Sequence, residues 1–410
     1  MVERNAASQR KADIVLSMTT AHSMDMRGSV DESDHYEIVD DPLALAALKH
    51  DWDALYERAV QPYFSQSFSW CWTSWRTVSE PRGRWLYCIV ARQGARAVLI
   101  WPFVIHRIGL LTVVRPLGPE TTEYTSILVE DGLKAAARIE KAWTMLRQTS
   151  HADIISLPLV RAGSELHRFL ASQNNPAFVD RDPASHVSRA MHANWDQYRL
   201  SLPSDMRKSI ARRRRRLQEK GPLIFEPSVV GPRRAAVIDW ILAQKRTWLA
   251  ETKHHNPWLL TDEYRNFLIA AATDPDGADG LLVSVLRLGD RIIAADMFRR
   301  DADRIEDFLT AYDPEFSAFG PGQMILEECL HWSFVEGLDF DLRIGWEGYK
   351  KLWTKEQIDV FSYEFANSYR GCLRIVALNM TQRLSRLRYK VPPEWRRKVK
   401  AALGRGGIAH

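Results

Sequence analysis

Residues 317–324 have the composition of a turn that leads into a helix, with the sequence Ser-Ala-Phe-Gly-Pro-Gly-Gln-Met. Glycines let a backbone approach a ligand closely, and a proline in the first helical turn gives up only an N–H without a helical partner. The unpaired N–H groups and the positive end of the helix dipole suit a pyrophosphate. An ordinary turn and helix start would give the same pattern. We predict a cofactor phosphate site formed by Ser317, Gly320, Gly322 and Gln323.

A second polar group follows a strand that we expect at residues 339–344. The sequence there is rich in glycine, charge and aromatic rings, which is unusual at the end of a buried strand. Strand alternation places Asp339, Asp341 and Arg343 on one face. An Asp–Arg pair on this face is either a structural ion pair or part of a site. We predict substrate contacts from Arg343, Glu347, Tyr349 and Lys350.

Five consecutive arginines, Arg212–Arg216, lie in a helix that we expect over residues 205–220, before Gly221-Pro222. Five consecutive positions surround the helix axis, so at least one arginine should face the protein body. That guanidinium can bind a phosphate through two parallel hydrogen bonds. A fully solvated helix, or a helix that holds the backbone of a tRNA, is the alternative.

Two units of mixed secondary structure position these residues. Residues 1–35 are polar and aperiodic, which predicts a flexible tail. Helices that begin at Asp41-Pro42 and around Phe68 precede a hairpin that turns at Gln93-Gly94. The other expected elements of the first unit are strands at 85–91, 97–106, 125–129 and 153–157 and a helix at 133–147.

The second unit follows a Pro/Asn-rich stretch, residues 174–183, that we interpret as a linker. After the arginine-rich helix, we expect helices at 233–251, 262–272 and 321–336. The expected strands are 281–288, 291–299, 304–311, 339–344 and 358–364. The domains predicted in this way are the tail 1–35, an N-terminal half 36–175, a C-terminal half 184–369 and a basic helical tail 370–410.

An internal repeat relates the two units. Residues 90–96, with the sequence Val-Ala-Arg-Gln-Gly-Ala-Arg, match residues 285–291, with the sequence Val-Leu-Arg-Leu-Gly-Asp-Arg, at a constant offset of 195. The order of elements also agrees on both sides of this turn, so duplication explains the match better than coincidence. Helices, an antiparallel meander, a helix and more strands predict an α/β fold with a mixed sheet in each half. The first copy has Glu130 and Asp131 where the second has its glycine-rich turn, and two carboxylates would repel a phosphate.

The charge is unevenly distributed along the chain. Residues 199–220 hold 9 basic and 2 acidic residues, residues 370–410 hold 11 and 1, and the remainder holds 36 and 48. An acidic body with two basic patches argues against broad affinity for nucleic acids. The four cysteines show no metal-binding or disulfide spacing, and the sequence has no membrane-spanning stretch or signal peptide. We expect a cytoplasmic protein without a metal. The basic C-terminal tail mixes apolar and basic residues, which suits either peripheral contact with an anionic membrane or packing on its own domain.

Four motifs occur in order along the second unit: Arg287-x-Gly-x-Arg291, Ala311-Tyr312-Asp313, Gly320-Pro321-Gly322 and Gly345-x-Glu347-x-Tyr349-Lys350. Together they resemble the GNAT-fold acetyltransferases associated with cellulose and exopolysaccharide biosynthesis. That family is similar to the Fem-type transferases, which also carry two GNAT-like halves. The basic helix that begins at Arg207-Lys208-Ser209-Ile210 looks like the helix that opens the second half in both.

The resemblance implies two tandem GNAT halves, with an acyl-CoA, most simply acetyl-CoA, bound by the second half only. The family usually has Gln or Arg three residues before the first loop glycine, where this chain has Ser317. GNAT enzymes often carry an acid or base on the strand after the hairpin, which implies Asp296 as general base, with Asp341 second and Tyr312 as proton donor. An acidic residue on this strand is alternatively a structural core carboxylate.

The resemblance therefore predicts transfer of an acyl group to an amine or hydroxyl of a sugar or cell-envelope precursor. Direct transfer needs positioning and polarisation of the thioester carbonyl rather than a covalent enzyme intermediate. Two alternatives remain open, which are aminoacyl transfer from a charged tRNA, as in the Fem-type proteins, and a non-catalytic scaffold in a polysaccharide-synthesis complex.

Overall fold

The computed structural model of the protein describes residues 33–173, 177–252, 254–274, 280–345 and 348–390, with side chains up to residue 382. Most of the expected N-terminal tail and the last twenty residues of the expected C-terminal tail lie outside these ranges. The first half contains β1 (His35–Val39), α2 (Pro42–Ala47), α3 (Lys49–Tyr56), α4 (Phe68–Ser74), β2 (Trp85–Gln93), β3 (Arg96–Ile108), β4 (Leu111–Pro116), β5 (Leu128–Val129), α5 (Ala135–Thr149), β6 (Ile154–Arg161) and α6 (Glu165–Ala171).

The second half is built in the same way, and α9, β9, α11 and β12 have the bounds predicted from the sequence. Its elements are β7 (Ala177–Val187), α7 (Trp195–Ser201), α8 (Ser204–Gln218), β8 (Leu223–Glu226), α9 (Arg233–Glu251), α10 (Asp262–Thr273), β9 (Leu281–Leu288), β10 (Arg291–Arg300), β11 (Arg304–Tyr312), α11 (Pro321–Glu336), β12 (Asp339–Ile344), α12 (Lys350–Trp353), β13 (Gln357–Ala366) and α13 (Tyr369–Lys390).

One continuous sheet runs through both halves in the order β1-β2-β3-β4-β6-β13-β7-β12-β11-β10-β9-β8. Each half contributes an antiparallel meander followed by one parallel pair, which is β4–β6 in the first half and β11–β12 in the second. The repeated turns also agree, because Gly94 and Gly289 both have a positive φ of about 60°, which favours glycine. The predicted α/β fold with two similar halves and mixed sheets is confirmed.

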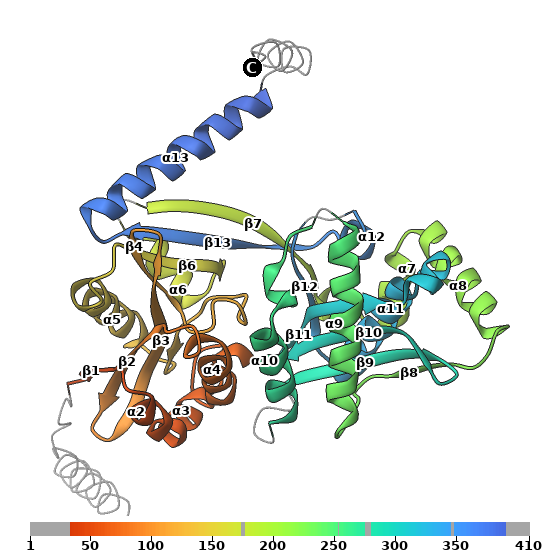
Figure 1. The fold of residues 1–410 in the computed structure, drawn as a ribbon, viewed down its shortest axis with the longest axis horizontal. Helices are drawn as coiled ribbons and strands as arrows, with labels where there is room; N and C mark the ends of the chain where they lie inside the picture. Colours follow the sequence, from red (N-terminus) through yellow and green to blue (C-terminus); the bar gives the residue numbers. More distant parts are fainter. Residues whose placement is uncertain (1–32, 174–176, 253, 275–279, 346–347, 391–410) are drawn as a thin grey trace, which may run out of the picture.

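The expected linker at residues 174–183 is wrong. Residues 177–187 form strand β7, which pairs antiparallel with β13 on one side and with β12 on the other. The start of this strand is exposed and carries alternating charges at Asp180, Arg181 and Asp182, so its sequence resembles a loop. Figure 1 shows β7 and β13 crossing side by side from one half to the other.

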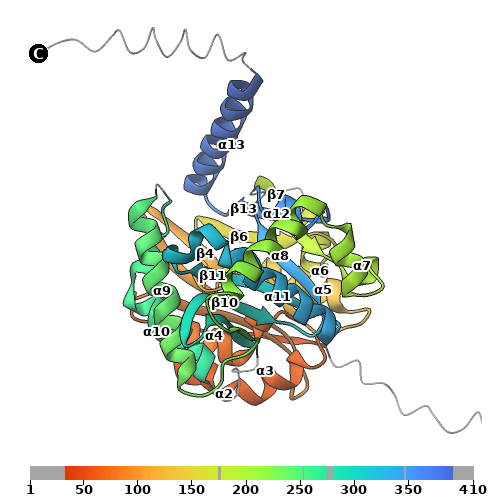
Figure 2. The same ribbon diagram turned by 90° about the vertical axis from the view of Figure 1, so that its right-hand side faces the viewer.

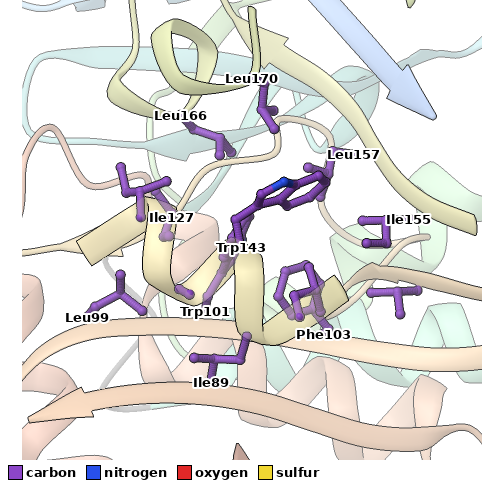
Figure 3. Packing of buried hydrophobic residues seen from close by; sticks show 14 of the residues in the cluster. Ile89, Leu99, Trp101, Phe103, Ile127, Trp143, Ile155, Leu157, Leu166 and Leu170 are labelled. Carbon is purple, nitrogen blue, oxygen red and sulfur yellow. The ribbon is translucent and has the colours of Figure 1, made fainter. Parts of the chain in front are cut away.

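Strand β13 joins the halves a second time, because it also pairs with β6 of the first half. Phe365 of β13 belongs to the first-half core, and its ring centroid lies 4.9 Å from that of Trp143 on α5. Figure 3 shows this core around Trp101, Phe103 and Trp143. The first half therefore completes its core with residues from near the C-terminus of the chain.

Helices cover both faces of the second-half sheet, as Figure 2 shows. One face packs against α7, α8 and α11 and the other against α9 and α10. Nowhere in the described ranges is a helix both long and apolar enough to cross a bilayer.

We predict that Phe365→Ala destabilises the first half, although residue 365 belongs to the second half in sequence. Loss of a buried phenylalanine costs about 3–5 kcal/mol of unfolding free energy. Hydrogen exchange measured by mass spectrometry should become faster in β2, β3 and β6. The control is Leu133→Ala, at an exposed position, which should leave exchange unchanged. Faster exchange confined to residues 204–351 would contradict the shared core.

Candidate active site

The parallel strands β11 and β12 separate in the middle of the second-half sheet. They pair only from Arg304–Asp339 to Glu306–Asp341, although β11 continues to Tyr312 and β12 to Ile344. Backbone groups on the facing edges beyond these pairs are therefore free of ladder bonds. A gap of this kind lets a ligand reach main-chain donors and acceptors inside a domain.

The turn after β11 brings the predicted phosphate-binding residues to the end of this gap. A 3₁₀ turn (Pro314–Phe319) leads to Gly320, whose φ of 63° makes it the left-handed N-cap of α11. The Gly320 N–H donates to the Ser317 carbonyl, and the Gly320 carbonyl accepts from the Gln323 N–H at 3.1 Å. A Cβ on Gly322 would lie 3.3 Å from the Tyr312 ring, so the turn and the end of β11 are in contact.

The repeated Arg-x-Gly-x-Arg motif anchors this turn. Arg291, its second arginine, donates to Asp313 at 2.6 Å and to Glu315 at 2.7 Å. Asp313 in turn accepts the Glu315 N–H at 3.0 Å. The motif thus fixes where the chain leaves β11 and enters α11.

One arginine of the basic helix reaches the same turn. The Arg213 Nη2 donates to the Gln323 Oε1 at 2.9 Å, and a Cβ on Gly320 would lie 2.4 Å from the Arg213 Nη1. Its neighbour Arg214 instead pairs with Glu327 and Glu328 on α11. The guanidinium of Arg213 and the α11 N-terminus therefore present positive charge to one place, as an anion site requires.

Two buried carboxyl groups lie beside the gap on adjacent strands. Asp296 on β10 is fully buried, and Asp307 on β11 is nearly so. The Thr310 hydroxyl lies 3.0 Å from the Asp296 Oδ1 and 3.3 Å from the Asp307 Oδ1. The Thr310 hydroxyl thus bridges the two carboxyl groups, and burial of two carboxyl groups this close together favours retention of a proton by one of them.

The pair holds its proton tightly. Burial, together with the neighbouring Asp307 carboxylate, raises the pKa of Asp296 well above its ordinary value. Burial raises the pKa of Asp307 to about 6, and the ammonium groups of Lys350 and Lys245 act in the opposite direction. Asp296 therefore keeps the proton, and Asp307 is the group that titrates near neutral pH.

A cavity of about 120 Å³ opens between α9 and the end of β11. Thr310, the residue that bridges the acid pair, lines it together with Tyr312, which is 44% exposed. The wall from α9 includes Lys245, Trp248 and Glu251. The cavity thus combines an aromatic ring with charged groups next to the buried acids.

Asp341 is engaged in structural hydrogen bonds at the junction between the halves. Its Oδ1 accepts from the Tyr124 hydroxyl at 3.1 Å and from the Arg343 N–H at 2.7 Å. Arg343 has a φ of 65°, so the regular alternation that would put it on the face of Asp341 is broken. Its guanidinium donates to the Phe308 carbonyl at 2.9 Å and pairs with Glu123 of the first half.

The other predicted substrate contacts, Lys350, Tyr349 and Glu347, differ in where they lie. Lys350 is buried, and its Nζ donates to the Ile344 carbonyl at 2.6 Å. Tyr349 is 39% exposed, and Glu347 lies outside the described residues. The structure therefore brings Arg343 and Lys350 into the gap and leaves Tyr349 at its rim.

A family model described as an acetyltransferase (GNAT) domain matches residues 204–351. The second half is therefore similar to GNAT acetyltransferase domains over these residues. A search of curated proteins gives no match.

Solved structures show the same fold over both halves. FemX covers 80% of this chain and 97% of its own length, with 9% identity and a TM-score of 0.54. A conserved protein of unknown function from Bacteroides thetaiotaomicron covers 80% of this chain and all of its own length, with 12% identity and a TM-score of 0.52. The GNAT match and these likenesses identify the architecture as two tandem GNAT halves.

Sequence reasoning missed Asp307 and could not choose among the arginines. The available signal for Asp307 was the pair Glu306-Asp307 inside the predicted strand 304–311. Adjacent residues of a strand point to opposite faces, so a sheet covered by helices on both faces would bury both acids, which points to a special environment. The selection of Arg213 depends on how α8 packs on α11, which the sequence does not reveal.

We predict that Asp307→Asn removes a pH-dependent loss of stability. Because the pKa of Asp307 is raised in the folded state, the folded protein binds this proton more tightly, so stability falls as the pH rises from about 4 to about 6. The advantage of the Asn variant over wild type should grow over this window to about 3 kcal/mol. Denaturant unfolding at several pH values measures it, with Asp290→Asn, at an exposed turn position, as the control. A constant difference across this range would contradict the raised pKa.

Proposed function

We propose that the protein transfers an acyl group, most simply acetyl, from acyl-CoA to an amine or hydroxyl of a sugar or cell-envelope precursor in the cytoplasm. The link to exopolysaccharide synthesis is part of this proposal. The observation that carries it is the position of Arg213 over Gly320, at the N-terminus of a helix that begins beside the strand gap and the acid pair.

The turn fits the pyrophosphate of acyl-CoA. Gly320 leaves space where a side chain would meet the Arg213 guanidinium, and α11 is 16 residues long, so its dipole is fully developed at this end. Arg213 would supply the phosphate contact that Ser317 is too short to make. Acyl-CoA, when bound, supplies an activated thioester.

The gap itself must open for the rest of the donor. The Arg343 guanidinium bridges from β12 to the Phe308 carbonyl on β11. Access of a ligand to the β11 backbone therefore requires Arg343 to release this carbonyl. Burial lowers the pKa of Arg343 to about 9, although its side chain is 20% exposed and pairs with Glu123.

Asp307 is the best candidate for the general base. A pKa of about 6 leaves it ionised at neutral pH and basic enough to accept a proton from an acceptor amine or hydroxyl. Asp296, our first choice from the sequence, is fully buried, and we assign it a positioning role beside Asp307 through the Thr310 hydroxyl that contacts both. Asp341 is less suitable, because Tyr124 and the Arg343 N–H already use its Oδ1.

The cavity beside α9 is a suitable place for the acceptor. Trp248 is 37% exposed there, and a tryptophan ring packs well on the apolar face of a sugar. Glu251 and Lys245 are polar partners for hydroxyl or amino groups. The Tyr312 hydroxyl at the cavity wall is a candidate to protonate the departing thiolate.

One observation favours a second function, which is aminoacyl transfer from a charged tRNA. The FemX likeness covers both halves and not only the GNAT domain. Helix α8 also leaves Arg212, Arg215 and Arg216 exposed, where they could hold a phosphate backbone. A scaffold without catalysis has no such specific support.

We predict micromolar binding of acetyl-CoA in calorimetric titration, weakened at least about ten-fold by Gly320→Ala. The new Cβ would collide with the Arg213 guanidinium. Gly289→Ala is the matched control, because Gly289 has nearly the same φ but open space around its Cβ position. Absence of binding to any acyl-CoA would reject the proposal, and salt-sensitive binding of charged tRNA would then support the second function.

We predict that Asp307→Asn lowers kcat for acetyl transfer by about 10²–10⁴-fold, because the variant lacks the general base that removes a proton from the substrate amine or hydroxyl. Amino sugars such as glucosamine are the first acceptors to screen. The affinity for acetyl-CoA should stay unchanged, which separates a catalytic loss from a binding loss. An unchanged kcat in this variant would remove Asp307 from the chemistry, whatever the outcome for Gly320.

A further inference from the structure

Helix α13 has two apolar faces, and only one of them packs on the protein. Ile375 is 3% exposed and lies in a small core with Val113, Ile154 and Ala366. Arg374 pairs with Glu364 at 3.2 Å, and the Asn379 side chain donates to the Ala177 carbonyl at 3.4 Å. These contacts fix the orientation of the helix against β13 and β7.

The other face is an exposed apolar stripe, here called the α13 stripe. It consists of Tyr369, Leu373, Val376 and Met380, which are 79%, 56%, 56% and 58% exposed. Their spacing of four, three and four residues places them in one row along the helix. The sequence continues this spacing with Leu384 and Leu387, and Figures 1 and 2 show the helix extending away from both halves.

Scattered exposed apolar residues are normal, but a contiguous row indicates a surface that something covers. The charge around the α13 stripe restricts which kind of partner can cover it. Residues 370–410 hold 11 basic residues and 1 acidic residue. The basic residues within the helix are Arg370, Arg374, Arg383, Arg386, Arg388 and Lys390.

A second copy of the chain is disfavoured as the partner. Antiparallel or parallel pairing of two α13 stripes would bring two strongly basic segments together without acidic partners, and like charges oppose such pairing. An anionic lipid bilayer matches both properties, because it offers an apolar interior for the stripe and negative headgroups for the flanking cations.

We infer that the α13 stripe docks on an anionic membrane surface. The helix lies in the headgroup layer with Leu373, Val376 and Met380 toward the acyl chains. Docking there holds the protein at the membrane without a spanning segment. This inference is independent of the proposed acyl transfer, because none of its residues belongs to the strand gap or the phosphate turn.

Flotation of the full-length protein with lipid vesicles tests the inference. The protein should float with vesicles of phosphatidylcholine that contain phosphatidylglycerol and not with vesicles of phosphatidylcholine alone. Binding should weaken as the salt concentration rises, since screening shortens the reach of the basic residues. The double variant Leu373→Glu/Val376→Glu should lose binding by at least about ten-fold.

The matched control is Leu110→Glu/Leu133→Glu, which makes the same kind of change at two highly exposed leucines in the first half. It should float like wild type, and both variants should keep the wild-type melting temperature, because none of the four positions is buried. Equal binding to neutral vesicles, absence of flotation, or unchanged binding by the α13 variant would overturn the inference. A dimer in light scattering that the α13 variant dissociates would overturn it in favour of a second copy.

Discussion

The early end of the β11–β12 ladder is the constraint on which the second half depends. After Glu306 and Asp341 the two strands no longer bond to each other, so their facing backbone groups need other partners. Side chains supply them, since Asp341 accepts the Arg343 N–H, Arg343 donates to the Phe308 carbonyl, and Lys350 donates to the Ile344 carbonyl. The polar residues in this gap thus replace a missing piece of sheet, which explains why Lys350 is buried and Arg343 partly buried there.

The same residues connect the gap to the first half. Tyr124 bonds to Asp341, Glu123 pairs with Arg343, and Arg299 pairs with Glu306 below them. Burial raises the pKa of Glu306 to about 7, and the Arg299 guanidinium opposes this rise. Because the junction is charged and buried, removal of any one partner would leave an uncompensated ion. The geometry of the gap is therefore set by both halves together and by the strands β7 and β13 that cross between them.

The regular helices and strands could be predicted well from the sequence. The crossing of strands β7 and β13 between the two halves could not. Strand β9 is an apolar run and β12 alternates charged with apolar residues, so the bounds of both follow from local pattern. Strand β7 carries exposed, charged residues at 180–182, followed by Pro183, so no local signal separates it from a loop. At the site, the glycine turn was visible as a motif. Asp307 and Arg213 were not, because their roles depend on which side chains other elements bring next to them.

The duplicated halves show how one architecture gives two different helix starts. In the second half, Gly320 and Arg213 meet the N-terminus of α11, while the acidic residues of the preceding turn, Asp313 and Glu315, pair with Arg291 instead. In the first half, Glu130 precedes α5 and is held by three arginines, Arg58, Arg96 and Arg138. The first half therefore carries its own anion where the second half leaves room for one. The two halves share the strand order and the turn, and they differ in the charged residues that lie at the start of one helix.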